Sequence, residues 1–354
     1  MMASKDHIVV ADDQLPLVAD VLPASCVVRV ASSEISNALL RSCQATALLV
    51  RSVTRVTSEL LRDTDVTFVG SATAGMDHIE PSLLSDPDIL VVGAPGCNAN
   101  AVAEYVMIWL DHLRRDPSSP LGIIGFGNVG QRLARYAIAR GHRVLVNDPP
   151  LADIGYTFPR LVSYVSLDDL LEQSSIVSIH TPLITHGVYQ TFGLLHAERI
   201  AQLQYGSLLF NTARGGIIDE RALCNRIDMG ELQAVLDVFT DEPAIHADTI
   251  NIITACTPHV AGYSEAAKYQ GARTVLQELQ AHFELNLTIP DLDRLLTRKT
   301  SLEEDHMLVT AHPFRSQWLR SPSPSTFEMC RRLTSLRAEH TQPPTWEELN
   351  GHRA

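Results

Sequence analysis

The sequence predicts an α/β protein that is built on parallel sheets and is divided into more than one domain. Short β-rich runs alternate with helical stretches from residue 8 to residue 255, and the pattern Gly125-x-Gly127-x-x-Gly130 closes one of these runs. The length of 354 residues exceeds what one hydrophobic core usually supports. Because ligands of open parallel sheets bind outside the carboxyl ends of the strands, we look for functional residues there.

The first hundred residues form the first βα series. Five strands are predicted, at Ile8–Ala11, Val27–Ala31, Ala47–Val50, Thr67–Gly70 and Ile89–Val92. A helix follows, and we expect Asn100 to be its N-cap because apolar residues recur at helical spacing after it. The segment Asp116–Pro120 ends this helix and leads to the glycine pattern.

The glycine pattern predicts a dinucleotide-binding turn between a strand and a helix. Gly125 permits the sharp turn, Gly127 lets the backbone approach a pyrophosphate, and Gly130 lets the helix pack against the strand. The phosphates would face the positive end of the helix dipole and its first amides, those of Asn128 and Val129. A glycine-rich turn that binds nothing is the alternative interpretation.

An acidic residue stands where the ribose of the dinucleotide is expected. Asp148 ends the next apolar run, Val144–Asn147, about 18 residues after Gly130. Its carboxylate can accept a hydrogen bond from a ribose 2′-hydroxyl and would repel a 2′-phosphate. No Arg or Lys follows in residues 149–152, so the sequence favours NAD over NADP as the cofactor.

The second βα series completes the predicted organisation. Its further strands are expected at Ile176–His180, Ser207–Asn211, Ala234–Val238 and Ile252–Ala255, and a long helix at about 264–284. Two long helices that flank one nucleotide-binding unit suggest that the chain leaves one domain, builds a second, and returns. We therefore expect a substrate domain at 1–96 and 264–289, an NAD-binding domain at 97–263, and a C-terminal extension at 290–354, which is a candidate oligomerisation region.

Composition excludes several classes of function. The net charge is −13 and no Lys/Arg block is present, which argues against a nucleic-acid partner. No apolar stretch has the length of a membrane span, and the start of the chain has no secretory signal pattern. No HExxH or paired Cys/His set points to a metal. The cysteines lack a CxxC pair, which fits reduced thiols in the cytosol: Cys26, Cys43, Cys97, Cys224, Cys256 and Cys330.

Three polar residues follow three successive strands of the second series. Arg214 follows the run Leu208–Phe210, Glu242 follows Ala234–Val238, and His259 follows the last strand. A guanidinium can hold a carboxylate and an adjacent carbonyl oxygen together, and an imidazole can exchange a proton near neutral pH. A Glu242–His259 hydrogen bond would favour the imidazolium and fix its tautomer. The sequence therefore predicts NAD-dependent redox chemistry beside a carboxylate.

With these segments the chain resembles the D-isomer-specific 2-hydroxyacid dehydrogenase family. The general resemblance lies in the glycine turn and in the segments Asn211–Gly216, Asp237–Pro243 and Thr257–His259. Narrower blocks resemble the branch of the family that acts on 4-phospho-D-erythronate: Leu49–Val56, Phe68–Ile79, Ala94–Asn98, Ala103–Val106, Asp148–Pro150 and His259–Tyr263. The resemblance covers about residues 7 to 285.

The resemblance implies a fold and a role for each residue. It implies a Rossmann-type NAD-binding domain inserted in a flavodoxin-like substrate domain, in a cytoplasmic homodimer. Arg214 and Glu242 would be catalytic and His259 the proton donor. NAD would contact Asp148, Thr181, Thr212, Asp237 and Gly262, in addition to the glycine turn. The phosphorylated 2-hydroxy acid would contact Ser52, Thr73 and Tyr263, and Arg51 is a candidate for its phosphate.

The chain departs from this branch of the family in three places, one of which is the short, proline-containing segment between Leu113 and Gly122. Thr212-Ala213 stands where Ala-Cys is usual before the arginine, and the tail from Pro290 matches no segment of the usual dimerisation domain. Two other functions stay open. One is a related dehydrogenase of glyoxylate, hydroxypyruvate or 3-phosphoglycerate type, and the other is a non-catalytic scaffold that responds to NAD.

Overall fold

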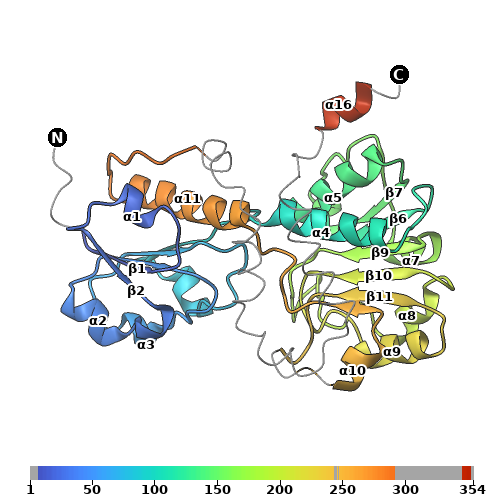
Figure 1. The fold of residues 1–354 in the computed structure, drawn as a ribbon, viewed down its shortest axis with the longest axis horizontal. Helices are drawn as coiled ribbons and strands as arrows, with labels where there is room; N and C mark the ends of the chain where they lie inside the picture. The colour runs from blue at the N-terminus through green and yellow to red at the C-terminus, as the bar shows by residue number, and fades with distance from the viewer. Residues whose placement is uncertain (1–6, 243–244, 246, 292–344, 352–354) are drawn as a thin grey trace. The chain divides into compact units, whose positions relative to one another are not determined.

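The computed structural model describes residues 7–242, 245, 247–291 and 345–351. Within these ranges the chain forms two compact units (Figure 1). The first unit contains the residues up to Asn98 together with those from Ser264 to residue 291, and the second contains Ala99–Tyr263 together with residues 345–351. Each unit has its own parallel sheet and its own hydrophobic core.

The first unit is a five-stranded sheet with the order β2-β1-β3-β4-β5. All of its strand pairs are parallel, and this order is the flavodoxin-like one that was predicted. The strands are β1 (Val9–Asp12), β2 (Val27–Val30), β3 (Ala47–Val50), β4 (Phe68–Ser71) and β5 (Leu90–Val92). The helices are α1 (Val18–Val21), α2 (Asn37–Ser42), α3 (Ser58–Leu61) and α11 (Glu265–His282), with short 3₁₀ turns at Ser32–Glu34 and Pro81–Ser85.

Alternate residues of these strands face two helical layers, because successive side chains of a strand point to opposite faces. Helices α1 and α11 lie on one side of the sheet and α2 and α3 on the other (Figure 1). Val9 and Leu49 pack with the first pair of helices, and Val10 and Leu48 pack with the second pair. Helix α11 lies very close to the sheet: a Cβ atom at Gly271 would stand 2.4 Å from the carbonyl oxygen of Ala72. The chain thus returns to its first unit through a helix that only glycine allows to pack so closely.

The second unit is a seven-stranded parallel sheet with the order β12-β11-β10-β9-β6-β7-β8. Numbered from β6, this order contains the doubly wound arrangement 3-2-1-4-5-6, so the predicted Rossmann-type fold is confirmed. The strands are β6 (Leu121–Ile124), β7 (Val144–Asn147), β8 (Val162–Tyr164), β9 (Ile176–Ile179), β10 (Leu208–Asn211), β11 (Gln233–Leu236) and β12 (Ala255–Cys256).

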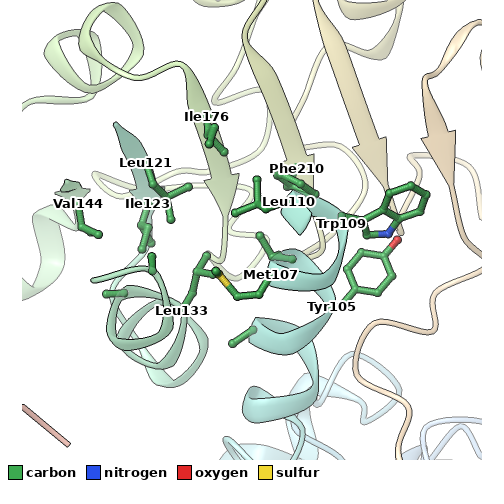
Figure 2. Close-up of a cluster of buried hydrophobic side chains, with 14 of the residues drawn as sticks. Tyr105, Met107, Trp109, Leu110, Leu121, Ile123, Leu133, Val144, Ile176 and Phe210 are labelled. Carbon is green, nitrogen blue, oxygen red and sulfur yellow. The ribbon is translucent and has the colours of Figure 1, made fainter. Parts of the chain in front are cut away.

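Helices cover both faces of this sheet. On one face, α4 (Ala99–His112) and α5 (Asn128–Ala139) pack against the sheet; Figure 2 shows Met107 and Leu110 of α4 directed toward β6, β9 and β10. The other face carries α7 (Leu167–Gln173), α8 (Ala197–Gln202), α9 (Glu220–Asp228) and α10 (Ala247–Ile252). Helix α6 (Pro149–Asp153) follows β7 directly.

Three local predictions are wrong or incomplete. Asn100 is not an N-cap: α4 begins at Ala99, and the Asn100 amide donates to the Glu104 carboxylate one turn later, at 2.7 Å. Ile252 ends helix α10 instead of beginning a strand, so β12 is only Ala255–Cys256. Strand β8 was not predicted, because two of its three residues are exposed and the run lacks a continuous apolar pattern.

The tail lies almost entirely outside the described residues; its described part is α16 (Trp346–Gly351). Leu349 is buried in the core beside α5, and the Trp346 ring lies 6.3 Å from the ring of Phe126, centroid to centroid. The cysteines that the structure describes are all free thiols. Among the described helices, none has both the length and the apolar character needed to cross a membrane.

Candidate active site

The turn after β6 has the backbone geometry that the glycine pattern predicts. Gly125 adopts φ +92°, and a Cβ atom there would meet the His180 carbonyl oxygen at 2.7 Å. A Cβ atom at Gly130 would stand 2.1 Å from the Gly125 carbonyl oxygen, because α5 begins directly against the strand end. Apart from the neighbours of Gly127 in the chain, nothing in the described part of the protein lies within 4 Å of its Cβ position. Two of the glycines are therefore required by packing, and the third faces open space.

That open space lies at the N-terminus of α5. Gly127 is the N-cap of the helix, and no side chain caps the helix there. The first helical residues are Asn128 and Val129, at the positive end of a twelve-residue helix dipole. This arrangement of amides, dipole and free space suits a pyrophosphate.

Asp148 ties the end of β7 to the glycine turn. One carboxylate oxygen accepts the Phe126 N–H at 2.7 Å, and the other accepts the Leu151 N–H at 3.1 Å and so caps α6. A carboxylate has about four acceptor sites, so these two bonds leave capacity for a ribose hydroxyl. The half-buried carboxylate is thus fixed in place beside the turn.

Thr181 follows His180 directly in the chain, and the Thr212 hydroxyl contacts the His180 ring, which the sequence did not single out. His180 Nδ1 lies 3.4 Å from the Thr212 hydroxyl and its Nε2 lies 2.8 Å from the Ser178 hydroxyl. Burial lowers the pKa of His180 to about 3, so its imidazole is neutral. The Thr181 hydroxyl is buried and has no hydrogen-bond partner among the described residues. Such an unpaired hydroxyl fits a site that a polar ligand group completes.

Arg214 belongs to a loop that Asn211 holds in shape. The buried Asn211 side chain donates to the Arg214 carbonyl at 2.9 Å and accepts the Ala213 N–H at 3.1 Å. The guanidinium Nη1 donates to the Ala213 carbonyl at 2.7 Å. A Cβ atom at Gly215 would stand only 1.9 Å from the Phe239 carbonyl oxygen, so the loops after β10 and β11 are in backbone contact.

The hydrogen bond that we expected between Glu242 and His259 is present. His259 Nδ1 and Glu242 Oε2 are 2.9 Å apart, and Glu242 Oε1 accepts the Phe239 N–H at 2.7 Å. The His259 side chain is 40% exposed and that of Glu242 19%, so the imidazole is accessible and the carboxylate behind it is largely covered. A carboxylate on Nδ1 leaves Nε2 as the ring atom that faces a ligand.

Opposing effects act on the pKa of His259. Burial lowers this pKa, while the hydrogen bond that His259 donates to Glu242 and the charges of Asp237 and Glu242 raise it, and the charge of Arg214 lowers it. The net shift is upward from the ordinary value of 6.5. Arg214 is therefore close enough to act electrostatically on the same imidazole, and His259 can exchange a proton near neutral pH.

Asp237 shapes the loop that carries His259. Its buried carboxylate accepts the Val260 and Ala261 N–H groups, both at 2.8 Å, and the Thr257 hydroxyl. Its backbone carbonyl accepts the His259 N–H at 2.9 Å. Burial raises the pKa of Asp237 to about 6. The family resemblance implies a cofactor contact for Asp237, whereas these loop contacts join residues 20 to 24 positions apart and no sequence pattern predicts them.

Gly262 and Tyr263 follow at the end of the second unit. Both are half-buried, and the Tyr263 N–H donates to the Val260 carbonyl at 2.9 Å, which closes the turn after His259. The structure thus brings Arg214, Glu242 and His259 together on the loops after β10, β11 and β12, in the unit that also holds the glycine turn.

The remaining candidates lie in the first unit, at the carboxyl ends of its strands. Ser52 is exposed just after β3, and Thr73 after β4 donates to the Gly75 carbonyl at 2.9 Å. Arg51 Nε lies 3.0 Å from the carboxylate of Asp12, which is fully buried. Arg51 therefore serves at least to pair a buried charge. Nowhere in the described parts of the chain do three or more His, Cys, Asp or Glu side chains form a possible metal site.

Comparison with known proteins finds similarity to dehydrogenases. Residues 112–261 match the family described as "D-isomer specific 2-hydroxyacid dehydrogenase, NAD binding domain". The erythronate-4-phosphate dehydrogenase of Acinetobacter baylyi is 43% identical over 238 residues, which are 65% of this chain and 65% of that protein. The enzyme of the same name from a Marinomonas species is 41% identical over 253 residues, 70% of this chain and 65% of that protein. The matches thus span just under two thirds of these relatives.

Solved structures share the fold. The D-lactate dehydrogenase of Aquifex aeolicus, complexed with NAD and lactic acid, superimposes with a TM-score of 0.61 at 23% identity and covers 78% of this chain and 95% of its own. The NAD-bound 3-phosphoglycerate dehydrogenase of Entamoeba histolytica gives a TM-score of 0.64 at 23% identity, with the same two coverages. At this identity the likeness concerns the fold alone.

Proposed function

The chain belongs to the D-isomer-specific 2-hydroxyacid dehydrogenase family, and on this premise we propose that it is an NAD-dependent oxidoreductase acting on the CH–OH group of a 2-hydroxy acid. The observation that carries the proposal is the Glu242–His259 hydrogen bond, with the charge of Arg214 acting on the same imidazole. These three groups supply what oxidation next to a carboxylate requires: a base, its orienting carboxylate and a cation.

The substrate that we propose is 4-phospho-D-erythronate, which would be oxidised to (R)-3-hydroxy-2-oxo-4-phosphooxybutanoate on the way to pyridoxal phosphate. The similarity to the two erythronate-4-phosphate dehydrogenases supports this choice. Ser52, Thr73, Tyr263 and Arg51 would bind the substrate. Since Arg51 Nε faces Asp12, its terminal nitrogens would be the ones available to a phosphate.

The site residues fit NAD. The open space at Gly127, the uncapped start of α5 and the buried unpaired hydroxyl of Thr181 are features that the cofactor would complete. Asn128, Val129, Asp148, Thr212, Asp237 and Gly262 would hold it as well. When bound, NAD supplies the hydride acceptor for the substrate C2–H.

The protein's own groups would handle the proton and the charge. His259 Nε2 would take the hydroxyl proton, because Nδ1 is held by Glu242. Glu242 would stabilise the imidazolium that results, and general base participation of this kind is worth about 10²–10⁴ in rate. Arg214 would bind the carboxylate and polarise the C2 oxygen. In the direction of reduction, protonated His259 would act as the acid.

A panel of 2-hydroxy and 2-oxo acids, followed by NADH absorbance, tests the function and its rivals. We expect the highest kcat/KM with 4-phospho-D-erythronate. Higher activity with 3-phosphoglycerate or with an unphosphorylated acid such as glycerate would assign the chain to another branch of the family. NAD binding without turnover on any member of the panel would contradict catalysis and favour an NAD-responsive scaffold.

We also propose roles for the two units and an assembly. The first unit would bind substrate and the second NAD, and two chains would form a cytoplasmic homodimer to which residues 290–354 contribute. The net charge of −13 argues against a nucleic-acid partner, while a small anionic substrate is compatible with it provided that cations such as Arg214 are gathered at the site. Light scattering that gives the mass of one chain at micromolar concentration would contradict the dimer.

A further inference from the structure

A buried hydrogen-bonded chain runs from α4 to the loop that carries His259. The Tyr105 hydroxyl, on a side chain with no exposed surface, lies 2.6 Å from Thr257 Oγ1. Thr257 is also fully buried, and its hydroxyl donates to Asp237 Oδ1. Because Thr257 has a single hydroxyl proton, Tyr105 must be the donor in the first bond. Tyr105 therefore donates to Thr257, and Thr257 donates to Asp237.

This series of hydrogen bonds ends at the Asp237 carboxylate, whose contacts hold the segment 257–261 in place. Asp237 accepts from the Thr257 hydroxyl and from the amides of Val260 and Ala261. Between these contacts stands His259, whose φ of +54° lies in the left-handed region that residues other than glycine seldom adopt. Such a conformation persists only where the surroundings enforce it. The contacts of Asp237 are those surroundings.

We propose that Tyr105 and Thr257 are positioning residues for proton transfer by His259: they fix the Asp237 carboxylate, which in turn fixes the His259 turn and acts on its imidazole. This inference rests on the proposed function only for its effect on turnover. In the proposed reaction, neither the Tyr105 hydroxyl nor the Thr257 hydroxyl touches the reacting atoms. Their action passes through Asp237.

The electrostatic reason follows from burial. In a low-dielectric interior, a carboxylate depends on its hydrogen-bond donors to remain charged, and burial already raises the pKa of Asp237 to about 6. Among the described residues, the charges of Glu242, Asp237 and Arg214 act on His259, and the charge of His259 acts on Asp237. Losing the Tyr105 hydroxyl weakens the donor chain, favours protonated Asp237, and removes one of the charges that raise the pKa of His259.

The competing explanation is that Tyr105 only fills the core. Its ring packs in the cluster between α4 and the sheet, 6.3 Å from the Trp109 ring (Figure 2). Tyr105→Phe keeps that ring and removes only the hydroxyl. Tyr136→Phe is a matched control, because the Tyr136 hydroxyl also bonds to α4 residues, 3.0 Å from Asn100 and 3.3 Å from Glu104, whereas the described donors to Asp237 are Thr257, Val260 and Ala261.

The test is a titration of His259 by NMR in the full-length protein with labelled histidine, the His259 signal being assigned from its loss in His259→Asn. We expect Tyr105→Phe to lower the His259 pKa by about half a unit or more, and Tyr136→Phe to leave it in place. Thr257→Val should lower it like Tyr105→Phe, and Thr257→Ser, which keeps the hydroxyl, should restore it. An unchanged His259 pKa in both Tyr105→Phe and Thr257→Val would overturn the inference.

Kinetics separate this inference from the proposed function. In the reduction of a 2-oxo acid, protonated His259 is required, so the basic limb of the kcat profile should move to lower pH in Tyr105→Phe and stay in place in Tyr136→Phe. A protein that shows the NMR shift but turns over no 2-hydroxy or 2-oxo acid would reject the proposed function and leave the positioning role standing. If Tyr105→Phe fails to fold, the His259 pKa values of Thr257→Val and Thr257→Ser test the inference instead.

Discussion

The second unit contains two loop regions that are built in opposite ways. The turn after β6 depends on missing side chains: Gly125 and Gly130 have no room for a Cβ atom, and Gly127 leaves its space open. The loops after β11 and β12 depend on added polar contacts, which converge on Asp237 and Glu242. The proposed cofactor region therefore requires residues without side chains, whereas the proposed proton-transfer region requires side chains that form hydrogen bonds. Mutations should therefore fail differently in the two regions.

The largest effect is expected in the polar loops. His259→Asn removes the base and should lower kcat by about 10²–10⁴. The affinity for NAD, measured by titration calorimetry, should stay within about threefold, since the glycine turn is untouched. A variant that keeps more than about a tenth of wild-type kcat would show that another group carries the proton.

The glycine turn offers a matched pair of substitutions. Gly130→Ala should destabilise the second unit by about 1–3 kcal/mol or more, because its Cβ would stand 2.1 Å from a backbone oxygen. Gly127→Ala should leave the unfolding temperature nearly unchanged but weaken NAD binding about tenfold, because its methyl group enters the space proposed for the pyrophosphate. Thermal unfolding and NADH fluorescence measure the two effects. Equal losses of stability in both variants would erase the distinction between packing and ligand glycines.

Glu242→Gln sharpens the electrostatic half of the comparison. The amide can still bond to His259 Nδ1 but lacks the charge that raises the His259 pKa. In reduction, where His259 must be protonated, the basic limb of the pH–rate profile should therefore move to lower pH by about one unit. If the basic limb stays in place, Glu242 orients the His259 ring but does not raise its pKa.

The smallest effect is expected behind the glycine turn, where α16 meets Phe126. Trp346→Ala removes a half-buried ring and should lower the unfolding temperature of the second unit by about 3–6 °C, with little change in kcat. Differential scanning calorimetry measures this shift. No shift would show that residues 345–351 do not contribute to the second unit in solution.

The sequence predicted the features that depend on local patterns. Most strand positions, the packing roles of Gly125 and Gly130 and the Glu242–His259 hydrogen bond followed from apolar runs, glycine spacing and the rule that parallel strands end at one edge. It could not reveal that Tyr105 meets Thr257, because 152 residues separate them and both are ordinary core residues by pattern. Asn100 was misassigned for a similar reason: a cap residue and a helix-interior Asn look alike until the start of the helix is known.

The most direct test of the central claim is the initial rate of NADH formation from 4-phospho-D-erythronate as a function of pH at saturating NAD. Oxidation needs neutral His259, so the rate should rise through an apparent pKa above 6.5, the ordinary value for histidine, and reach a plateau. His259→Asn should abolish this rise. Saturable NAD binding with no NADH produced at any pH would contradict the account.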